Sequence, residues 1–399
     1  MSAAPGSRPL RVLAYTDQRY WRRDDGIWAQ RSFVRFFGGL AKHVGALTVL
    51  GRLSDEDADD AHYRLPDGVG FVALPWYSSA ADPVALARAA TGSVRRFWRA
   101  LDDADVCWLL GPSPFAILFA GIALLRRRRV VLGVRQDLPA YARSRHPGRR
   151  AHALVADLQE GAFRMLARRM PVVTVGDDLA RNYGRSRALL PLPISLVAER
   201  DVLPGGEARV PRFDDDELRV LTVSRLDEEK NPLLLAEVLE RLVAADSRWR
   251  LVVAGEGPLA GALHARLGQL GLADRAALLG HVDLDPGLRE LYRTSHAFLH
   301  VSWTEGLPQV LFEAFAAGLP VVATDVGGVA AAAGDAALLV GPGDADAPAA
   351  ALLRIAAEPE LADTLTERAL TRARATTIEA TTGRLAAFLD DPYLPASSR

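Results

Sequence analysis

The sequence predicts an α/β protein made of two doubly wound, Rossmann-like domains. Its 399 residues are enough for two domains of ordinary size. Short apolar runs alternate with segments of helical spacing, which is the pattern of parallel strands covered by helices on both faces. Most runs in the second half also lead into loops rich in Gly, Ser, Thr or Asp, where open α/β sheets bind ligands.

The composition is that of a globular protein. Hydrophobic residues make up 49% of the chain and charged residues 24%, which excludes long disorder and a coiled coil. The single cysteine, Cys107, excludes an internal disulfide framework and a cysteine-based metal site, and it fits a reducing compartment. Residues 1–9 lack the apolar stretch of a secretory signal. The longest apolar run, residues 112–125, is shorter than the about 20 residues that span a bilayer. We therefore expect a cytoplasmic protein.

Residues 1–200 are expected to form the first domain. After the first strand we predict a polar loop that holds Gly26 and then a helix, because apolar residues from Ile27 to Leu40 recur near helical spacing. The predicted strands are residues 10–15, 46–50, 69–74, 106–110, 130–134 and 172–175.

Proline and glycine cluster between residues 191 and 211, which marks the boundary between the domains. Residues 201–375 are expected to form the second domain, and residues 376–399 a helical tail that packs back on the first. The second domain has predicted strands at residues 218–223, 249–254, 276–279, 297–301, 320–324 and 336–340. Its predicted helices are residues 232–242, 259–270, 286–292 and 308–317.

Charge is distributed unevenly between the two halves. Residues 1–200 hold 30 Lys and Arg against 19 Asp and Glu, whereas residues 201–399 hold 18 against 30. Such a split indicates an anionic partner for the first half. Lysine is rare, since only Lys42 and Lys230 occur, and an isolated lysine in an arginine-rich chain is a candidate functional residue.

The first polar loop of the second domain carries Arg225 and Lys230 just before a helix that begins near Pro232. Two cations beside a helix N-terminus suit a diphosphate, because backbone N–H groups add to their charge. The acidic residues 227–229 support another interpretation, a solvated charged loop, and this loop alone does not decide between the two.

Two further loops are weaker signals. Gly255 and Gly257 follow a strand in the spacing G-x-G-x-x-x-G, which indicates a tight turn where backbone approaches a ligand rather than a dinucleotide fingerprint. His281 and Val282 follow the next strand. A lone histidine is more often a packing or surface residue than a catalyst, although the backbone of this loop could recognise a planar base.

The fourth loop is the most specific. A buried strand ends near Val301, Glu305 lies in the loop, and Glu313 lies in the second turn of the helix after Pro308. Apolar neighbours predict that the Glu313 carboxylate is partly buried, which is costly unless it accepts strong hydrogen bonds. Hydroxyl groups of a sugar or a ribose would supply them, and Gly306 removes a side chain where backbone N–H groups approach an anion.

The segment from Glu305 to Glu313 resembles the E-x7-E motif of the retaining GT-B glycosyltransferases of family four, the glycosyl transferases group 1. The resemblance covers residues 218–345 and is weak in the first half. It implies the GT-B fold, in which two Rossmann-like domains face each other across a cleft. Four further motifs follow in the family's order and at about its spacing: Arg225 with Lys230, Gly255-Glu256-Gly257-Pro258, Gly280-His281-Val282 and Thr324-Asp325-Val326-Gly327-Gly328.

This resemblance also implies a role for each candidate residue. Arg225 and Lys230 would hold the donor diphosphate and neutralise its charge during catalysis. Glu313 would bind the ribose hydroxyls, and Glu305 would bind hydroxyls of the transferred sugar and take part in catalysis. The other donor contacts would come from Gly26, Gly255, His281, Val282, Gly306 and Leu307.

The chain departs from the family at two places. Many members carry His-Asp after a strand of the first domain, whereas Gln136 stands here at the position of the histidine. Asp137 is thus left as the expected catalytic polar group near the anomeric centre. Many members also carry a glutamate after the Gly-Gly-Val turn, where this chain has alanine at residues 330–333.

The resemblance implies a retaining hexosyltransferase that moves a sugar from a nucleoside-diphosphate sugar to an acceptor hydroxyl, with no metal and no other cofactor. Three alternatives remain open. These are a nucleotide-sugar epimerase on the same architecture, a nicotinamide oxidoreductase built on the Gly255 loop, and a non-catalytic nucleotide-sugar-binding protein. The sequence does not identify the sugar, the base or the acceptor.

The arginines of the first half bear on the acceptor side. They could simply complement the dipoles of helix ends. They could also face an anionic or lipid-linked acceptor, or give the first domain a peripheral contact with the inner face of a membrane. Aromatic residues do not interleave with them, so no nucleic-acid partner is expected. The arginines form three groups: residues 126–129, then Arg143, Arg145, Arg149 and Arg150, then Arg164, Arg168 and Arg169.

Overall fold

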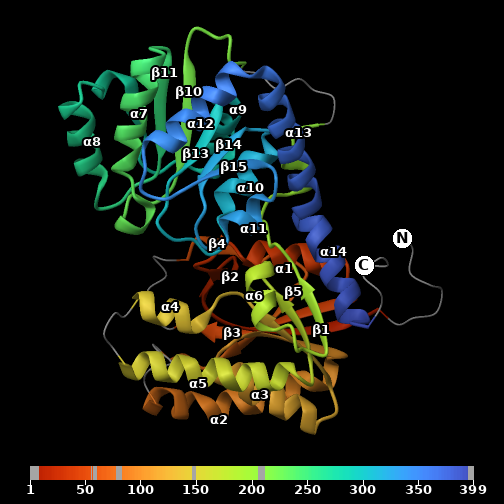
Figure 1. Cartoon of the computed structure of the whole chain (residues 1–399). Helices are drawn as coiled ribbons and strands as arrows, with labels where there is room; N and C mark the ends of the chain where they lie inside the picture. The colour runs from red at the N-terminus through yellow and green to blue at the C-terminus, as the bar shows by residue number, and fades with distance from the viewer. Residues whose placement is uncertain are drawn as a thin grey trace. The chain divides into compact units, whose positions relative to one another are not determined.

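A computed structural model of the chain describes residues 9–54, 56, 61–77, 83–145, 150–204 and 212–393. The chain forms two compact units (Figure 1). The first unit consists of Met1–Leu196 together with Ile378–Arg399, and the second of Val197–Thr377. The chain therefore passes from one unit to the other twice.

The first unit is built on a mainly parallel sheet. Seven strands run parallel in the order β5-β3-β1-β6-β7-β8-β9, and β2 and β4 add an antiparallel extension beside the end of β1. These strands are β1 (Arg11–Arg23), β2 (Gly26–Ala29), β3 (Ala46–Leu53), β4 (Tyr63–Arg64), β5 (Val69–Leu74), β6 (Val106–Gly111), β7 (Arg129–Val134), β8 (Pro171–Thr174) and β9 (Ala188–Pro191). The helices are α1 (Val34–Ala41), α2 (Pro83–Ala100), α3 (Pro114–Leu125), α4 (Leu138–Arg145), α5 (Arg150–Ala167), α6 (Asp177–Asn182) and α14 (Ile378–Asp390), with the 3₁₀ turn η1 (Leu101–Asp103).

Helices cover both faces of this sheet because successive strand residues point to opposite sides. In β1, Leu13 and Tyr15 pack among residues of α2, α3 and α5. Val12 and Ala14 pack on the opposite face, among residues of α1 and α14. Central strands such as β6 are buried along nearly their whole length, which explains their continuous apolar sequences.

The prediction of a helix starting at Ile27 is wrong. Residues Gly26–Ala29 form β2, which pairs antiparallel with the last residues of β1, and the helix α1 begins only at Val34. Gly26 allows the hairpin because its φ of +143° is open only to glycine at low cost. Asp25 holds the turn, since its Oδ1 accepts from Trp28 Nε1 at 2.8 Å and its carbonyl accepts from Arg64 Nε at 2.8 Å.

The second unit is an all-parallel sheet in the order β12-β11-β10-β13-β14-β15. Its strands are β10 (Leu218–Val223), β11 (Trp249–Ala254), β12 (Ala276–Leu278), β13 (Ala297–His300), β14 (Val321–Thr324) and β15 (Ala337–Val340). Its helices are α7 (Leu234–Ala245), α8 (Ala260–Gln269), α9 (Arg289–Thr294), α10 (Gln309–Ala316), α11 (Val329–Ala333), α12 (Asp346–Ala357) and α13 (Pro359–Thr376). Short turns are η2 (Glu199–Asp201), η3 (Glu228–Lys230), η4 (Ala273–Arg275) and the π-helical η5 (Leu284–Leu288).

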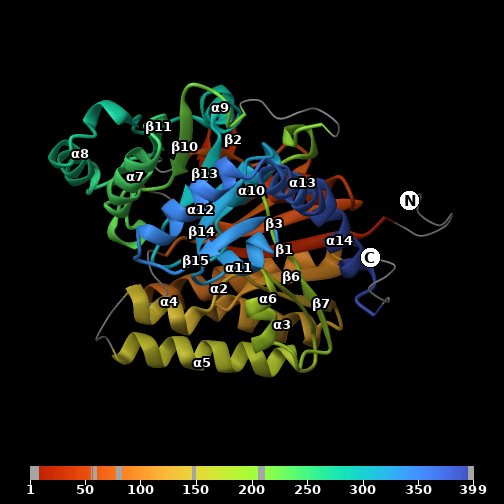
Figure 2. The ribbon, with the colours of Figure 1, turned by 45° about the horizontal axis from the view of Figure 1, so that its top comes forward.

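Two cores flank this second sheet. Residues of α7, α8 and α12 fill one face and residues of α9, α10, α11 and α13 the other, and α10 lies beside α13 in both ribbon views (Figure 2). Each of the two sheets is doubly wound. The strand order reverses between β1 and β6 in the first and between β10 and β13 in the second. Ligands of such sheets bind beyond the carboxyl ends of the strands at these reversal points. Of the helices among the described residues, none has the length and apolar character needed to cross a bilayer.

Candidate active site in the second unit

Glu305 is the centre of a buried polar cluster beside the reversal point of the second sheet. Its Oε1 accepts hydrogen bonds from Lys230 Nζ at 2.6 Å, from His300 Nε2 at 2.8 Å and from Ser302 Oγ at 2.8 Å. The Glu305 side chain is 9% exposed and that of Lys230 15%. The loops after β10 and β13 are therefore tied together by a buried ion pair.

These contacts decide the protonation state of Glu305. Burial by itself would raise the pKa of the carboxyl group. The hydrogen bond from His300 and the charge of Lys230 outweigh burial and hold the pKa at about 2. Because the ionised carboxylate can only accept, His300 must donate from Nε2. His300 Nδ1 is buried and has no hydrogen-bond partner among the described residues.

The backbone after β10 explains how Lys230 reaches this cluster. Residues Glu228–Lys230 form the 3₁₀ turn η3, in which the Lys230 N–H donates to the Asp227 carbonyl at 3.1 Å. Asn231 then takes a left-handed conformation with φ of +52°, which asparagine tolerates better than most residues. The chain thereby turns into α7, and Lys230 is left at the base of the loop.

Arg225, which the sequence pairs with Lys230, lies in the same loop but in a different environment. Its side chain is 66% exposed, and its guanidinium pairs with Asp227 and Glu229. The interpretation of a solvated charged loop therefore describes Arg225, and diphosphate binding by this loop stays a prediction. Lys230 is a buried cation within a built cluster, whereas Arg225 is a solvated cation compensated by its own loop.

Glu313 lies on α10 and is held by Tyr292 of α9. The Tyr292 hydroxyl donates to Glu313 Oε2 at 2.9 Å. Burial, and then the charge of Glu313, raise the pKa of Tyr292 well above its ordinary value, so the hydroxyl stays protonated and can keep donating. The partial burial expected of the Glu313 carboxylate agrees with its intermediate exposure.

Three glycines pack the site loops against one another. A Cβ on Gly255 would lie 1.8 Å from the Ser224 carbonyl oxygen, one on Gly327 2.0 Å from that of Glu305, and one on Gly328 1.9 Å from that of Gly306. The space beside Gly255 is thus occupied by the loop that carries Arg225. Gly306 differs, because a Cβ there would meet nothing within 4 Å. Among the described residues, the Cβ side of Gly306 is therefore open, as a site of ligand approach requires.

The remaining predicted contacts come from several different elements. His281 and Val282 follow β12 at the edge of the sheet, and the His281 side chain is 72% exposed with Nε2 3.5 Å from Asp283 Oδ1. Leu307 is half-buried beside Gly306. Gly26 and Asp137 belong to the first unit, and their contribution to donor binding and catalysis stays a prediction.

Asp137 has a structural role in the first unit. Its Oδ1 accepts from the Ala140 N–H at 2.9 Å, and its Oδ2 lies 3.5 Å from Asn182 Nδ2. The carboxylate therefore caps the N-terminus of α4, which is a common use of aspartate at this position. Gln136, beside it, is exposed.

Sequence reasoning missed three residues of the site. His300 and Ser302 hold Glu305, and Tyr292 holds Glu313. A polar residue at the end of an otherwise buried strand is the only sequence signal for His300 and Ser302. Tyr292 gives no signal, because its contact with Glu313 joins two helices at positions 21 residues apart in the chain. Within the part of the chain that the structure describes, no three His, Cys, Asp or Glu side chains form a group suited to a metal ion.

The family comparison agrees with this geometry. Residues 207–372 match the family described as glycosyl transferases group 1. The matched segment lies within the second unit and makes up less than half of the chain. Two curated relatives are each 32% identical to this chain over the matched length. They are the gpi3 subunit of phosphatidylinositol N-acetylglucosaminyltransferase from Schizosaccharomyces pombe, over 158 residues, and the putative glycosyltransferase EpsF from Bacillus subtilis, over 170 residues. Both matches cover 40% of this chain but only 34% and 44% of the relatives' own lengths.

Solved glycosyltransferase structures resemble the whole chain. Sucrose-phosphate synthase from Thermosynechococcus elongatus matches with a TM-score of 0.67 at 18% identity, over 96% of this chain and 98% of its own. The Anabaena protein HepE, solved in complex with UDP, matches with a TM-score of 0.67 at 15% identity, over 96% of this chain and 100% of its own. The expected fold class, α/β of the GT-B type with two Rossmann-like domains, is confirmed. The chain therefore has the GT-B fold, and its residues 207–372 match a glycosyltransferase family.

Proposed function

We propose that this chain is a retaining glycosyltransferase that moves a sugar from a nucleoside-diphosphate sugar to an acceptor hydroxyl. The buried Lys230–Glu305 pair at the reversal point of the second sheet is the observation that carries the proposal. It brings a cation suited to a diphosphate next to a carboxylate suited to sugar hydroxyls. Solved structures of HepE contain UDP, UDP with glucose, or UDP-glucose, and this supports a nucleotide-sugar donor here.

In the proposed complex the two carboxylates contact different parts of the donor. Glu313, fixed by Tyr292, accepts from the ribose hydroxyls. Glu305, fixed by His300 and Ser302, accepts from hydroxyls of the transferred sugar. The backbone of Gly306 and Leu307 approaches the diphosphate, and the loop at His281 and Val282 borders the base. A carboxylate with a pKa near 2 stays an acceptor throughout the working pH range.

Transfer in this proposal is a front-side displacement. The acceptor oxygen attacks the anomeric carbon from the side on which the diphosphate departs, and its proton passes to the departing phosphate oxygen. Lys230 and Arg225 stabilise the negative charge that develops on this leaving group, so the proposal needs no metal ion. Asp137 of the first unit remains the proposed polar group near the anomeric centre.

Measurement of donor chemistry tests this proposal. The full chain is screened by thermal shift against UDP, GDP and ADP and their hexose conjugates, and the donor found is then incubated with candidate acceptors. A transferase gives a glycoside whose anomeric configuration, read by NMR, equals that of the donor sugar. An epimer formed from donor alone would instead support an epimerase, and saturable binding without turnover a binding protein.

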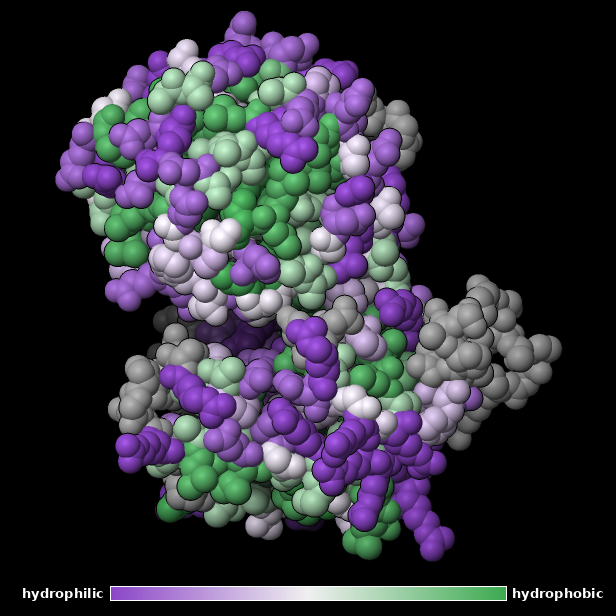
Figure 3. Space-filling view, in the orientation of Figure 1, coloured by the Kyte–Doolittle hydropathy of each residue, from purple (hydrophilic) through white to green (hydrophobic). Residues whose placement is uncertain are grey.

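The acceptor side of the proposal rests on the surface of the first unit. Leu154, Leu158 and Met165 follow one another along the outer face of α5, and each is more than 60% exposed. Leu118 and Leu125 form a second exposed stripe on the neighbouring helix α3. Soluble proteins seldom expose apolar stripes of this kind without a partner. Figure 3 shows hydrophobic patches among strongly hydrophilic residues over α5.

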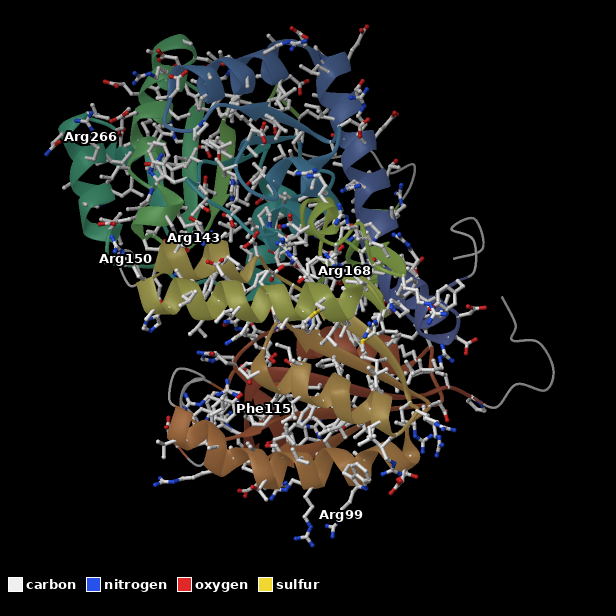
Figure 4. All side chains as sticks on the ribbon, turned by 60° about the horizontal axis from the view of Figure 1, so that its bottom comes forward. Arg99, Phe115, Arg143, Arg150, Arg168 and Arg266 are labelled. Atoms are coloured by element: carbon white, nitrogen blue, oxygen red, sulfur yellow. The ribbon has the colours of Figure 1, made fainter. Side chains whose placement is uncertain are left out.

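Arginines border these apolar stripes. Arg150 and Arg168 lie near the two ends of α5 (Figure 4), and residues 126–129 follow directly after α3. Arg143 is compensated by Asp157 at 3.2 Å; the Arg145 side chain and Arg149 lie outside the described residues. An apolar helix face bordered by arginines suits an anionic membrane surface. The proposal is a peripheral contact of α3 and α5 with such a surface. The phospholipid in the name of the gpi3 relative supports a lipid-linked acceptor.

A further inference from the structure

The first unit holds a pocket of about 410 Å³ at the carboxyl edge of its sheet. Asp17 and Gln18 reach it from the irregular point of β1, and Arg52, Ser113 and Arg135 reach it from the ends of β3, β6 and β7. These strands include β1 and β6, between which the strand order reverses. The pocket therefore occupies the place where an open α/β sheet binds a ligand.

Four arginines line this pocket, and two of them are already compensated. Arg52 forms an ion pair with Asp17, with Nε 3.1 Å from Oδ1, and donates to the Asp17 and Tyr77 carbonyls at 2.7 Å each. Arg19 pairs with Glu56 and donates to Ser54 Oγ at 3.2 Å. Arg52 and Arg19 are thus part of the pocket wall, and their charges are balanced.

Arg31 and Arg135 line the same pocket without such compensation. Among the described residues, neither guanidinium has a carboxylate within the 4.0 Å of an ion pair. The carboxylate of Asp17, which also lines the pocket, is taken up by Arg52 and by the hydroxyls of Tyr15 and Tyr77. The pocket therefore has a surplus of two positive charges.

Arg135 is also held in place. Its guanidinium carbon lies 5.0 Å from the centre of the Phe33 ring, and the side chain is half-buried. Burial, and then the like charge of Arg31, lower the pKa of Arg135 to about 10, so it is still a cation at neutral pH. A cation in such surroundings is costly until an anion compensates it. The site would gain from a bound anion.

Gln18 adds a group that an anion alone would not use. Its side chain is 6% exposed, and its Nε2 donates to the Arg31 carbonyl at 3.3 Å. Its Oε1 is buried and, within the part of the chain that the structure describes, has no hydrogen-bond partner. A ligand hydroxyl could donate to this oxygen while an anionic group contacts the two arginines. This combination fits a phosphate ester of a polyol or a sugar.

We propose that this pocket binds the phosphate group of a phosphorylated acceptor through Arg31 and Arg135, with Gln18 accepting from an acceptor hydroxyl. The identification of this ligand as an acceptor rests on the proposed transferase function, whereas the binding of a phosphate ester does not. Guanidinium groups match phosphate oxygens in charge and in planar geometry.

The proposed anion site does not include the arginines of residues 126–129, which stand out most clearly in the sequence. Residues 126–129 precede or begin β7, so they lie at the amino edge of the sheet, opposite the pocket. Arg126 pairs there with Asp102 at 2.7 Å, and Arg129 donates to the carbonyls of Leu389 and Asp390. Arg135, six residues after Arg129, follows the other end of the same strand.

Isothermal titration of the full chain tests the pocket. The probes are inorganic phosphate, glycerol 3-phosphate and a short-chain phosphatidic acid below its micelle concentration, each titrated with UDP saturating the donor site. We expect Arg31→Gln and Arg135→Gln each to weaken binding on the order of ten- to a hundredfold, as loss of a charge-assisted contact does. The control is Arg88→Gln, which removes the same charge from α2, outside the pocket lining, and which we expect to bind as wild type does.

These measurements distinguish a lipid-borne phosphate ester from a free one. They also distinguish failure of the pocket proposal from failure of the transferase proposal. Binding of phosphatidic acid but not of glycerol 3-phosphate would identify a lipid-borne ester, and binding of both would identify the phosphate ester itself as the recognised group. No binding of any probe, or equal affinity in wild type and Arg31→Gln, would overturn the pocket proposal. Arg31 is exposed, so its variant keeps the test valid if Arg135→Gln misfolds. If no donor supports transfer but the arginine variants still lose phosphate binding, the transferase proposal fails while the anion site stands.

Discussion

Lys230 Nζ and Glu305 Oε1 lie 2.6 Å apart, although 75 residues separate them in the chain. The lysine comes from the loop after β10 and the glutamate from the loop after β13. The ion pair therefore joins the two strands between which the sheet order reverses. An incoming diphosphate would share Lys230 with Glu305, so donor binding and the state of Glu305 are coupled through one ammonium group.

Lys230→Ala is expected to weaken nucleoside diphosphate binding more than Arg225→Ala does. A charge-assisted phosphate contact contributes roughly 1.5–3 kcal/mol, and Lys230 offers it from a fixed, buried position, whereas exposed Arg225 must leave Asp227 and Glu229 first. Titration with UDP and GDP measures both variants. Lys42→Ala, at the exposed end of α1, removes the only other lysine and should leave affinity unchanged. Unchanged affinity in both site variants would refute the assignment.

Glu305→Gln is expected to lower turnover more than nucleotide affinity, and Glu313→Gln to do the reverse. The reason is that Glu305 should meet the sugar and Glu313 the ribose. Steady-state kinetics and UDP titration of both variants give the two quantities. Tyr292→Phe, which removes the hydroxyl that holds Glu313, should follow Glu313→Gln in direction. Equal losses of both quantities in both glutamate variants would show that the roles are wrongly divided.

The stability conferred by Glu305 should depend on pH in a defined window. Its pKa is lowered from 4.5 to about 2 in the folded chain, so the unfolded chain binds the proton more readily. The stabilisation is therefore complete above about pH 4.5 and is lost as the pH falls towards 2. A shift of this size corresponds to about 3 kcal/mol.

Urea midpoints of wild type and Glu305→Gln at pH 7, 5, 4 and 3 measure this effect. The difference between the two proteins should be largest at pH 7 and 5 and should shrink at pH 4 and 3. Glu240→Gln, an exposed glutamate on α7, serves as the control and should differ little from wild type at each pH. A Glu305→Gln difference that stays constant across the series would contradict the low pKa.

His300 is expected to act as a positioning residue through Glu305. His300→Phe removes the donor to Oε1 while keeping a ring in the buried site, and we expect kcat to fall about tenfold with a smaller change in the KM for donor. His300→Gln should recover part of the loss, because its amide can donate from nearly the same position as Nε2. A kcat equal to that of wild type in the Phe variant, or identical losses in Phe and Gln, would count against this role.

The surface of α3 and α5 should bind anionic membranes in a salt-dependent way. Co-sedimentation with neutral and anionic liposomes across a salt series is measured for wild type and for a variant with residues 126–129 changed to Gln. We expect wild type to bind anionic vesicles and this variant to bind them weakly, since each basic residue near the surface contributes about 1 kcal/mol.

Two further variants make the membrane test specific. Leu154→Ser with Leu158→Ser removes exposed apolar side chains from α5 without changing charge, and it should also weaken binding. Changing Arg241, Arg266, Arg354 and Arg368 to Gln removes four charges from the second unit and should have little effect. Binding that ignores lipid charge and salt, or no binding, would remove the membrane contact and leave a freely diffusing acceptor.

Most of the second unit could be predicted because each of its strands is a mainly apolar run followed by a loop of small or polar residues. Every strand predicted for the second unit matches an observed strand, and the predicted and observed ends agree within about two residues. In the first unit the spacing from Ile27 to Leu40 fits a helix as well as a hairpin and a shorter helix. The pairing of β2 with β1 decided between them, and pairing is a tertiary contact that local spacing does not encode.

The residues of the site also fall into two groups, those that the sequence indicates and those that it does not. Lys230, Glu305 and Glu313 stand out in the sequence because their positions relative to strand and helix ends are informative. Their partners do not stand out. His300 ends an apolar strand, and Arg31 and Arg135 are two of many arginines. What singles them out is burial, or the lack of a carboxylate partner among the described residues, and both depend on the folded chain.

The placement of α14 has a consequence for how the protein is made. This helix follows the whole second unit in the chain, yet its Leu385, Phe388 and Leu389 are buried in the core of the first unit, together with residues of α1. During synthesis the second unit is complete before α14 leaves the ribosome, so the unit that is started first is finished last. Until α14 emerges, an apolar strip of α1 and the neighbouring strands is uncovered, in contrast to the usual order in which N-terminal domains fold first. A stop codon just before Ile378 would therefore damage the unit at the beginning of the chain rather than the one at the truncation.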